Sequence, residues 1–363
     1  MKKAVQIAGI NILILSVIVV ALELVFGNWL QRNPAKRLPE LARQTGRTYQ
    51  FKTNGLSGED VEVNFKRDKE GLRGKSKGPE NKRQILVLGG STAIEFTVPE
   101  ENTWAEQLEK GLNQTSKIDN IDVINAGISG QTLLGNRVAV QTWLSKLDSL
   151  KPELVLVYYG YNDSVYTLHD TPTSQNDPDS KAQSLKETIL LNSALAMLGR
   201  ELKGNYKAWA NDNQYLFDYQ PEALPSGEML YIADSKEQDR KAINSPYPVK
   251  LRQLITTLQQ TWPSAKLVFI AQSDPNCLFV SHNSYRAKEK SQRCENLLAI
   301  HRYTRNYINK LKSMPTNNLE VIYEPLFLDN PYDRSGASDH IHTNSRGSLG
   351  IAQKLSPRIQ NHL

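Results

Sequence analysis

Five short apolar runs alternate with longer segments of helical periodicity over the last three quarters of the chain. The predicted strands are Gln84–Leu88, Ile121–Asn125, Leu154–Tyr159, Lys266–Ala271 and Leu319–Tyr323. The predicted helices are Thr103–Leu112, Leu133–Leu150, Pro248–Gln260, Cys294–Lys312 and Ser345–Arg358. The strands are apolar at nearly every position, which is typical of strands buried on both faces. Their alternation with helices predicts an α/β fold, in which helices cover both faces of a parallel sheet.

One stretch, at about residues 164–245, interrupts this alternation. It contains a polar loop at Thr171–Lys181, a helical pattern at Leu185–Leu202 and then an aromatic-rich segment. The aromatic residues are Tyr206, Trp209, Tyr215, Phe217, Tyr219 and Tyr231. An insertion of this length beside a functional site is often a lid or a substrate-binding subdomain. The aromatic residues are equally suited to a small core of the insertion itself.

The chain begins with an apolar segment of transmembrane length. Residues Ala4–Leu22 follow Met1-Lys2-Lys3 without a charge, and the first acidic residue is Glu23. A helix needs about 20 such residues to cross a bilayer, and Trp29 follows where an interfacial anchor belongs. The length favours an uncleaved anchor over a cleaved signal peptide, although Val19-Val20-Ala21 is an acceptable cleavage site.

Basic residues flank this segment on both sides, and their charges favour opposite orientations in the membrane. Lys2 and Lys3 favour a cytoplasmic start, whereas four basic residues beyond the segment favour the opposite orientation. These four are Arg32, Lys36, Arg37 and Arg43. Because two lysines before an apolar run are typical of export signals, we expect the body on the periplasmic or extracellular side. Cys277 and Cys294 are compatible with one disulfide there, and two unpaired buried thiols are an equal alternative.

Length and charge add an outline of the domains. The 363 residues divide into an anchor at 1–30, a polar stalk and small cap at 31–82, and a main domain at 83–363 that carries the insertion. The net charge of +6 gathers partly between Lys66 and Arg83. Because no recognition motif or aromatic platform accompanies this basic cluster, we interpret it as a solvated linker and expect no nucleic-acid partner.

A candidate nucleophile, Ser91, directly follows the first predicted strand in the run Gly89-Gly90-Ser91-Thr92. Ligands of open α/β sheets bind at the carboxyl ends of the strands, and glycines there allow a sharp turn. The run lacks the lysine of a P-loop and the third glycine of a dinucleotide fingerprint. A serine hydroxyl in this place needs a base to become a nucleophile.

The segment Ser338-Asp339-His340-Ile341-His342 near the end of the chain supplies candidate bases. A spacing of three residues lets one turn place Asp339 and His342 on the same side. Asp339 can then accept a hydrogen bond from His342 Nδ1 and leave Nε2 to take the proton of Ser91. His340 is the competing base and ranks second, because its side chain points elsewhere in that arrangement. A polar loop in which Asp339 caps a turn is the alternative interpretation.

Two more strand ends offer donors for a developing oxyanion. Gly130 follows the second predicted strand, and its N–H is not shielded by a side chain. Asn162 follows the third strand in Gly160-Tyr161-Asn162-Asp163 and offers its amide. Taken singly, each residue is equally typical of an ordinary turn.

In order and placement, these blocks resemble those of the SGNH hydrolases, also called the GDSL esterase and lipase family. The matching residues are Ser91, Gly130, Asn162, Asp339 and His342, and the likeness spans Arg83–Gln360. The resemblance implies a three-layer α/β/α sandwich of flavodoxin type with a mainly parallel five-stranded sheet. It also implies a serine esterase that forms an acyl-enzyme on Ser91 and needs no metal or cofactor. Ser91, Gly130 and Asn162 would form its oxyanion hole.

The first block departs from the usual Gly-Asp-Ser-Leu of that family, because Gly90 replaces the Asp and Thr92 the Leu. Neither position transfers a proton, so we expect activity to survive, but the subfamily and the substrate stay open. An anchored, exported position favours esters of envelope glycans or lipids as substrates. Acyl transfer to an extracellular polysaccharide from the same site is an alternative, as is a membrane-tethered binding protein without turnover. The Asp-x-x-His pair together with Gly-x-Asn-Asp disfavours the α/β-hydrolase fold.

Overall fold

The computed structural model covers the elements that carry the site. It describes residues 2–30, 33–54, 61–74, 82–115, 120–166, 189, 192–210, 214–216, 229–233, 235–314, 320–332, 334–339 and 341–363. The predicted loop Thr171–Lys181 and the competing base His340 lie outside these residues.

The centre of the fold is a five-stranded sheet in which every neighbouring pair is parallel. Its strands are β3 (Arg83–Gly89), β4 (Ile121–Asn125), β5 (Pro152–Tyr159), β8 (Lys266–Ala271) and β11 (Val321–Glu324). Their spatial order is β11-β8-β5-β3-β4. The predicted α/β fold with a five-stranded parallel sheet is confirmed. The chain reverses its direction across the sheet between β3 and β5, and such a switch point is where α/β folds bind ligands.

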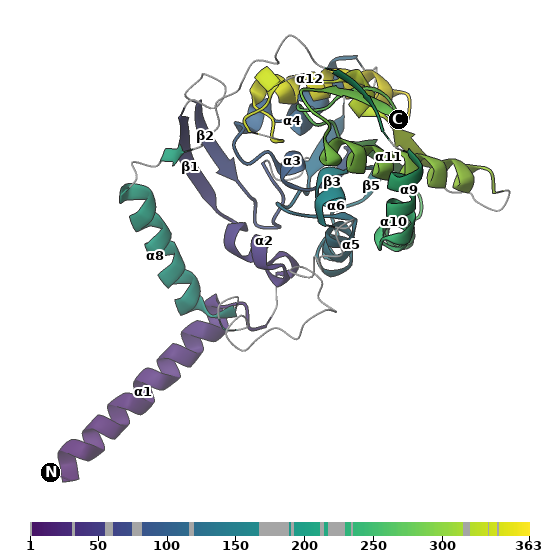
Figure 1. Cartoon of the computed structure of the whole chain (residues 1–363). Coiled ribbons are helices and arrows are strands. Elements are labelled where there is room, and N and C mark those ends of the chain that lie inside the picture. Colours follow the sequence, from purple (N-terminus) through teal and green to yellow (C-terminus); the bar gives the residue numbers. More distant parts are fainter. Residues whose placement is uncertain are drawn as a thin grey trace.

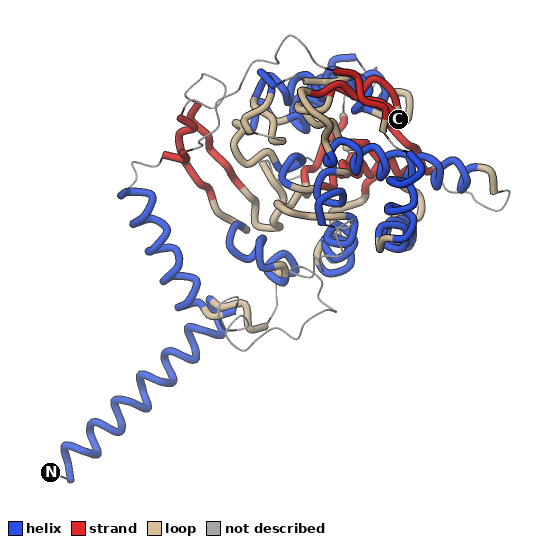
Figure 2. Tube along the Cα trace, in the orientation of Figure 1, coloured by secondary structure: helices blue, strands red, loops and turns tan. Residues whose placement is uncertain are grey.

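Helices cover both faces of this sheet, as Figure 2 shows. Alternate residues of each strand enter two separate cores, since Ile85 and Val87 pack on one side of β3 and Leu86 and Leu88 on the other. The first core contains α4 (Trp104–Thr115) and α12 (Ser345–Gln360). The second contains α5 (Leu133–Thr142), α10 (Tyr247–Thr261) and α11 (Gln292–Lys312).

The helix α5 is shorter than the predicted helix Leu133–Leu150. It begins where the Thr132 side chain accepts a hydrogen bond from the Gly135 N–H. It ends because Trp143 leaves the helical conformation and buries its ring, with Nε1 donating to the Glu70 carbonyl at 2.6 Å. A short 3-10 turn at Leu144–Lys146 follows. This ending depends on a tertiary contact, which the periodicity of the sequence does not contain.

The segment before the sheet forms structure of its own. A 3-10 turn (Pro34–Arg37) and α2 (Pro39–Gln44) precede the antiparallel pair β1 (Thr48–Asn54) and β2 (Val61–Lys66). The side chains of Ala35, Leu38 and Leu41 are buried in the same core as α5 and α11. The inner face of the hairpin packs Phe51, Val63 and Phe65 against Ile94. These residues therefore pack directly on the main domain.

Within the insertion, the structure describes α8 (Ala194–Ala210), β6 (Gln214–Leu216), β7 (Met229–Ile232) and α9 (Ser235–Asn244). β6 pairs with β1, and β7 joins β9 (Leu278–Ser281) and β10 (Ser284–Ala287) in a second small sheet. Tyr231 stacks on Tyr285 with ring centroids 5.6 Å apart, whereas Tyr206 and Trp209 are exposed. The aromatic residues of the insertion therefore have different environments.

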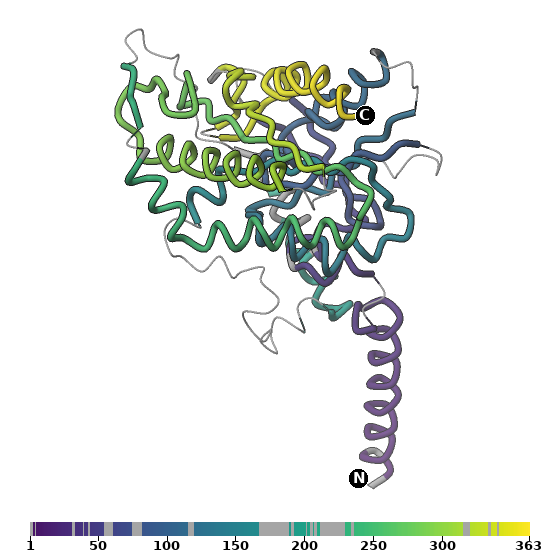
Figure 3. The backbone as a smooth tube through the Cα atoms, turned by 90° about the vertical axis from the view of Figure 1, so that its right-hand side faces the viewer, coloured from purple at the N-terminus to yellow at the C-terminus, as the bar shows by residue number. Residues whose placement is uncertain are grey.

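The first helix, α1 (Lys2–Phe26), projects from the body with the N-terminus at its far end (Figures 1 and 3). Its segment Val5–Phe26 is long and apolar enough to cross a membrane, and none of it is buried among the residues that the structure describes. An uncleaved anchor and a signal sequence both meet this description.

Candidate active site

The candidate nucleophile and one candidate oxyanion donor lie at the switch point of the sheet. Ser91 begins the short helix α3 (Ser91–Ile94) directly after β3, and Asn162 lies in α6 (Tyr161–Tyr166) directly after β5. A Cβ placed on Gly90 would be 2.5 Å from Asn162 Nδ2 and 3.2 Å from the Gln131 carbonyl oxygen. Three segments that are distant in the sequence therefore meet beside Ser91. A side chain at position 90 would displace Asn162, so this close approach favours glycine here.

The loop after β4 is held against α3 by backbone and side-chain hydrogen bonds. Asn125 Nδ2 donates to the Ala93 carbonyl at 2.8 Å, and the Ile128 N–H donates to the Gly89 carbonyl at 3.0 Å. Further along this loop, Gly130 has φ +75° and its missing side chain would face open space. Its left-handed conformation favours glycine. Asn162 Nδ2 donates to the Gln131 carbonyl at 2.8 Å, so the amide lies next to this turn.

Asp339 and His342 contact each other directly. His342 Nδ1 and Asp339 Oδ2 are 2.6 Å apart, and Asp339 Oδ1 accepts from the backbone N–H groups of Ile341 and His342 at 2.8 and 2.7 Å. Burial opposes ionisation of Asp339, but the hydrogen bond and charge of His342, with the two backbone donors, outweigh it and lower the pKa of the carboxyl. An ionised carboxylate fixed in this way orients the imidazole and favours a proton on Nδ1.

Glu95 links the Ser91 helix to the His342 segment, although the sequence analysis did not identify it. Its Oε1 accepts from Thr343 Oγ1 and Ser348 Oγ, each at 2.5 Å, and Oε2 accepts from the Trp104 N–H at 2.7 Å. Its backbone N–H donates to the Ser91 carbonyl at 2.9 Å, which closes α3. Thr343 is the neighbour of His342 in the chain. The only signal in the sequence is a single acidic residue between the apolar Ile94 and Phe96.

The Glu95 carboxyl is fully buried, and burial raises its pKa to about 7 even though three donors oppose the rise. Asp163, which follows Asn162, is a second carboxyl of this kind. Burial raises its pKa to about 7, against the hydrogen bond from the Leu133 N–H and the charge of Lys250. Asp163 thereby joins the start of α5 to the Asn162 segment. Glu95 and Asp163 therefore fix the segments that carry the candidate site residues.

Two buried arginines hold the backbone around α3 in place. Arg73 donates to the carbonyls of Ile94 and Glu95 and, at 2.7 Å, to that of Val98. Arg67 donates to the carbonyls of Gly71 and Gly127, each at 2.7 Å. Burial, together with the charge of Arg73, lowers the pKa of Arg67 to about 9. The interpretation of this basic cluster as a solvated linker is therefore wrong for Arg67 and Arg73, whose burial depends on carbonyls distant in the sequence.

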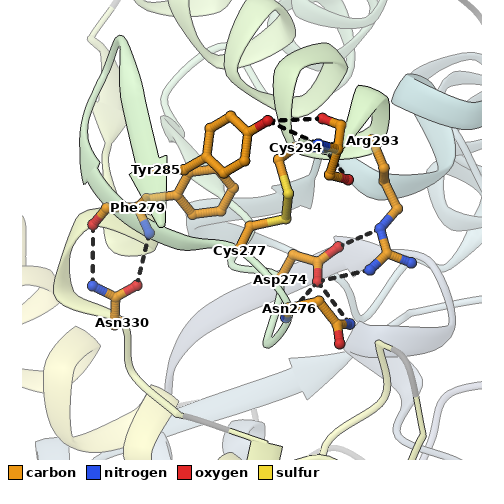
Figure 4. Close-up of a disulfide and its surroundings, with 9 residues drawn as sticks. Asp274, Asn276, Cys277, Phe279, Tyr285, Arg293, Cys294 and Asn330 are labelled. Carbon is orange, nitrogen blue, oxygen red and sulfur yellow. Dashed lines mark hydrogen bonds and ion pairs between the residues drawn. A yellow bond between two sulfur atoms is a disulfide. The ribbon is translucent and has the colours of Figure 1, made fainter. Parts of the chain in front are cut away.

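A disulfide joins Cys277, in the loop after β8, to Cys294, at the start of α11 (Figure 4). Beside it, Asp274 pairs with Arg293, with Oδ2 and Nε 2.9 Å apart. The Arg293 guanidinium lies over the ring of Tyr161, 5.7 Å from its centroid. Tyr161 precedes Asn162, so the disulfide fixes a charged pair at the edge of the site.

The residues proposed from the sequence thus fall into connected groups. Asp339 and His342 are in direct contact, Ser91 is joined to their segment through Glu95, and Asn162 abuts the residue before Ser91. A partly buried acid–imidazole pair, a serine at a strand end and nearby amide donors are the groups that acyl transfer through a serine requires.

Comparison with known families agrees with this chemistry. The model of the GDSL-like lipase/acylhydrolase family matches residues 87–348, which is more than half of the chain. The chain therefore belongs to this family, also known as the SGNH hydrolases, and it is an esterase-type serine hydrolase. No curated protein matches the chain.

Several solved structures are similar to this chain at low identity. A GDSL-family protein from Veillonella parvula is 13% identical, with 77% of this chain and 100% of that one covered and a TM-score of 0.40. A psychrotrophic esterase from a Pseudoalteromonas species is 15% identical, with coverage of 77% and 98% and a TM-score of 0.40. An acetylxylan esterase from Geobacillus stearothermophilus is 13% identical, with coverage of 77% and 96% and a TM-score of 0.40.

Proposed function

We propose that this protein is a membrane-anchored esterase that cleaves carboxylic esters through an acyl intermediate on Ser91. The observation that carries the proposal is the 2.6 Å contact between Asp339 Oδ2 and His342 Nδ1. It holds the imidazole in the tautomer whose free Nε2 accepts a proton. Ser91, the serine whose proton His342 would accept, lies at the strand end where ligands of this fold bind.

In the proposed acylation step, Ser91 Oγ attacks the ester carbonyl carbon while His342 Nε2 takes the hydroxyl proton. The carbonyl electron pair moves onto oxygen and forms a tetrahedral oxyanion. When this intermediate collapses, the bond to the alcohol oxygen breaks and His342 returns the proton to the leaving alkoxide. Water then repeats the sequence on the acyl-serine, which releases the carboxylic acid and restores Ser91. Asp339 stays ionised throughout and stabilises the imidazolium.

The proposed oxyanion hole consists of the backbone N–H groups of Ser91 and Gly130 and the side-chain amide of Asn162. The exposed turn at Gly130, with its left-handed backbone, supports this role, because no side chain shields its N–H. The Asn162 amide has two N–H bonds, of which one is directed to the Gln131 carbonyl. Donors fixed before the reaction stabilise the developing charge without reorganisation.

We further propose that α1 is an uncleaved anchor and that the substrates are esters on envelope glycans or lipids. The 25-residue helix is longer than the apolar core of a typical signal peptide. The disulfide between Cys277 and Cys294 supports an oxidising compartment on the far side of the membrane.

A panel of esters tests this function. Nitrophenyl esters from acetate to palmitate, acetylated xylan, acetylated peptidoglycan and a lysophospholipid are supplied to the full-length protein and to Ser91→Ala and His342→Ala. We expect both variants to lose hydrolysis while Ser145→Ala, at an exposed serine of a remote turn, retains it. Undiminished hydrolysis by Ser91→Ala would overturn the proposal. Transfer of the acyl group to an added sugar would identify the acyltransferase alternative.

A further inference from the structure

The helix α8 carries an apolar stripe that no other residue described by the structure covers. Its members follow one another at spacings of three and four residues and therefore share one face of the helix. They are Leu195, Leu198, Leu202, Tyr206 and Trp209. Each is at least half exposed, from 52% at Leu198 to 74% at Trp209. A soluble helix normally buries such a face.

The start of α8 is fixed to the end of α1. The Glu23 carboxylate accepts hydrogen bonds from Ser193 Oγ and from the N–H groups of Ala194 and Leu195, at 2.8, 2.9 and 3.1 Å. The Trp29 indole N–H donates to the same carboxylate at 2.8 Å. Glu23 thus caps α8 from within the last turn of the membrane-length segment Val5–Phe26. Figure 1 shows α8 leaving this junction in a different direction from α1.

We propose that α8 lies in the surface of the membrane that α1 spans, with its apolar stripe in the lipid. This proposal rests on the anchor role of α1 given above. In this placement the apolar stripe of α8 is covered by lipid, at the boundary between the headgroups and the acyl chains.

Continuity and composition favour lipid as this occupant. The Glu23 contacts hold the first turn of α8 at the depth where α1 leaves the bilayer, so the stripe begins at the interface. Tyr206 and Trp209 end the stripe, and these two residue types prefer that interface. Lys203 is exposed and, at helical spacing, lies off the stripe, as in helices that bind along membrane surfaces.

The far end of α8 leads back to the candidate active site. The strand β6 pairs with β1 at Tyr215 and Thr53. The β1–β2 hairpin packs against Ile94 of α3, the helix that Ser91 begins. A helix held in the membrane surface would therefore set the height of the Ser91 site above the lipid.

Single spin labels on the full-length protein in vesicles of phosphatidylcholine and phosphatidylglycerol test the placement. The labels are attached to Leu202→Cys and Trp209→Cys on the stripe, to Lys203→Cys as the matched control on the same helix, and to Leu15→Cys in α1. The two native cysteines form the disulfide and do not take the label. Collision with oxygen reports lipid exposure, and collision with a water-soluble nickel chelate reports water exposure. Hydrolysis of nitrophenyl acetate at the unlabelled rate checks that each protein is folded.

We expect oxygen accessibility several-fold above nickel accessibility at the two stripe positions and the reverse at Lys203→Cys. Stripe labels as water-exposed as the control, with Leu15→Cys in lipid, would overturn the placement of α8 while the anchor stands. Stripe labels shielded from both reagents would overturn it in favour of a protein partner, either this chain or a second copy. If Leu15→Cys itself is in water, the anchor is wrong and the placement of α8 falls with it.

Discussion

The buried carboxyl of Glu95 makes the stability of this protein depend on pH, and Glu95→Gln isolates its contribution. Glutamine keeps the shape of the side chain and an acceptor oxygen for Thr343 and Ser348 but cannot ionise. In the wild type, burial raises the pKa of Glu95 from 4.5 to about 7. Between these values the folded state holds a proton that the unfolded state has lost. The stability from this proton is complete below pH 4.5 and is lost as the pH rises through 7.

The magnitude follows from the size of the rise. Each pKa unit corresponds to about 1.4 kcal/mol, so a rise from 4.5 to about 7 lowers the free energy of unfolding by roughly 3 kcal/mol over that interval. Burial also raises the pKa of Asp163 to about 7, so Asp163 likewise lowers the free energy of unfolding as the pH rises. Glu95→Gln should remove the pH-dependent loss of stability that comes from Glu95 and leave the loss that comes from Asp163.

The assay is urea unfolding of the full-length protein in mild detergent between pH 5 and pH 8, followed by tryptophan fluorescence. We expect the wild type to lose stability as the pH rises and Glu95→Gln to lose roughly 2.5 kcal/mol less, because pH 5 already lies above the unfolded-state pKa of 4.5. Glu101→Gln, at an exposed glutamate, should follow the wild type. A Glu95→Gln curve parallel to that of the wild type would refute the reasoning, because the carboxyl would then not be titrating in this interval.

Three further changes test the site and its support. Asp339→Asn removes the acceptor that fixes the imidazole tautomer, so kcat for nitrophenyl acetate should fall by about 10⁴; a fall of less than tenfold would contradict the proposed role. Gly90→Ala places a Cβ 2.5 Å from Asn162 Nδ2, so kcat should fall on the order of 10²-fold through the displaced oxyanion donor, with an unchanged circular dichroism spectrum. Replacing both Cys277 and Cys294 by Ser opens a loop of sequence separation 17, which should lower the free energy of unfolding by about 3 kcal/mol in the same urea assay.

Matched controls separate these effects from general damage. Gly199→Ala, where an added Cβ meets no atom within 4 Å, should leave kcat unchanged. Asp148→Asn, at an exposed acid remote from Asp339, should do the same. If Gly90→Ala were as active as Gly199→Ala, the close approach of Gly90 and Asn162 would not hold in solution.

The strands of the central sheet were predictable because they are apolar on both faces. Ile121–Asn125 and Lys266–Ala271 have the predicted bounds, and the other three core strands differ at their ends by one or two residues. The end of α5 was not predictable, since it depends on the burial of Trp143. The β1–β2 hairpin was also missed, because the apolar residues on its inner face are few and widely spaced among polar ones.

The candidate site also has a part that the sequence predicts and a part that it does not. The order of Ser91, Gly130, Asn162, Asp339 and His342 along the chain was sufficient to predict the family. The hydrogen bonds by which Glu95 and Arg73 hold these residues in place were not predictable, because only the folded chain brings their partners near them. The solvated interpretation of Arg73 followed from its charged neighbours, whereas its burial follows from the carbonyls at the end of α3.

Covalent labelling of the nucleophile tests the central claim most directly. The full-length protein is treated with a fluorophosphonate, and the modified residue is located by mass spectrometry. We predict one adduct, on Ser91, that is absent from Ser91→Ala and forms much more slowly in Asp339→Asn. An adduct on another residue, or none on Ser91 while the protein hydrolyses esters, would contradict the assignment of Ser91 as the nucleophile.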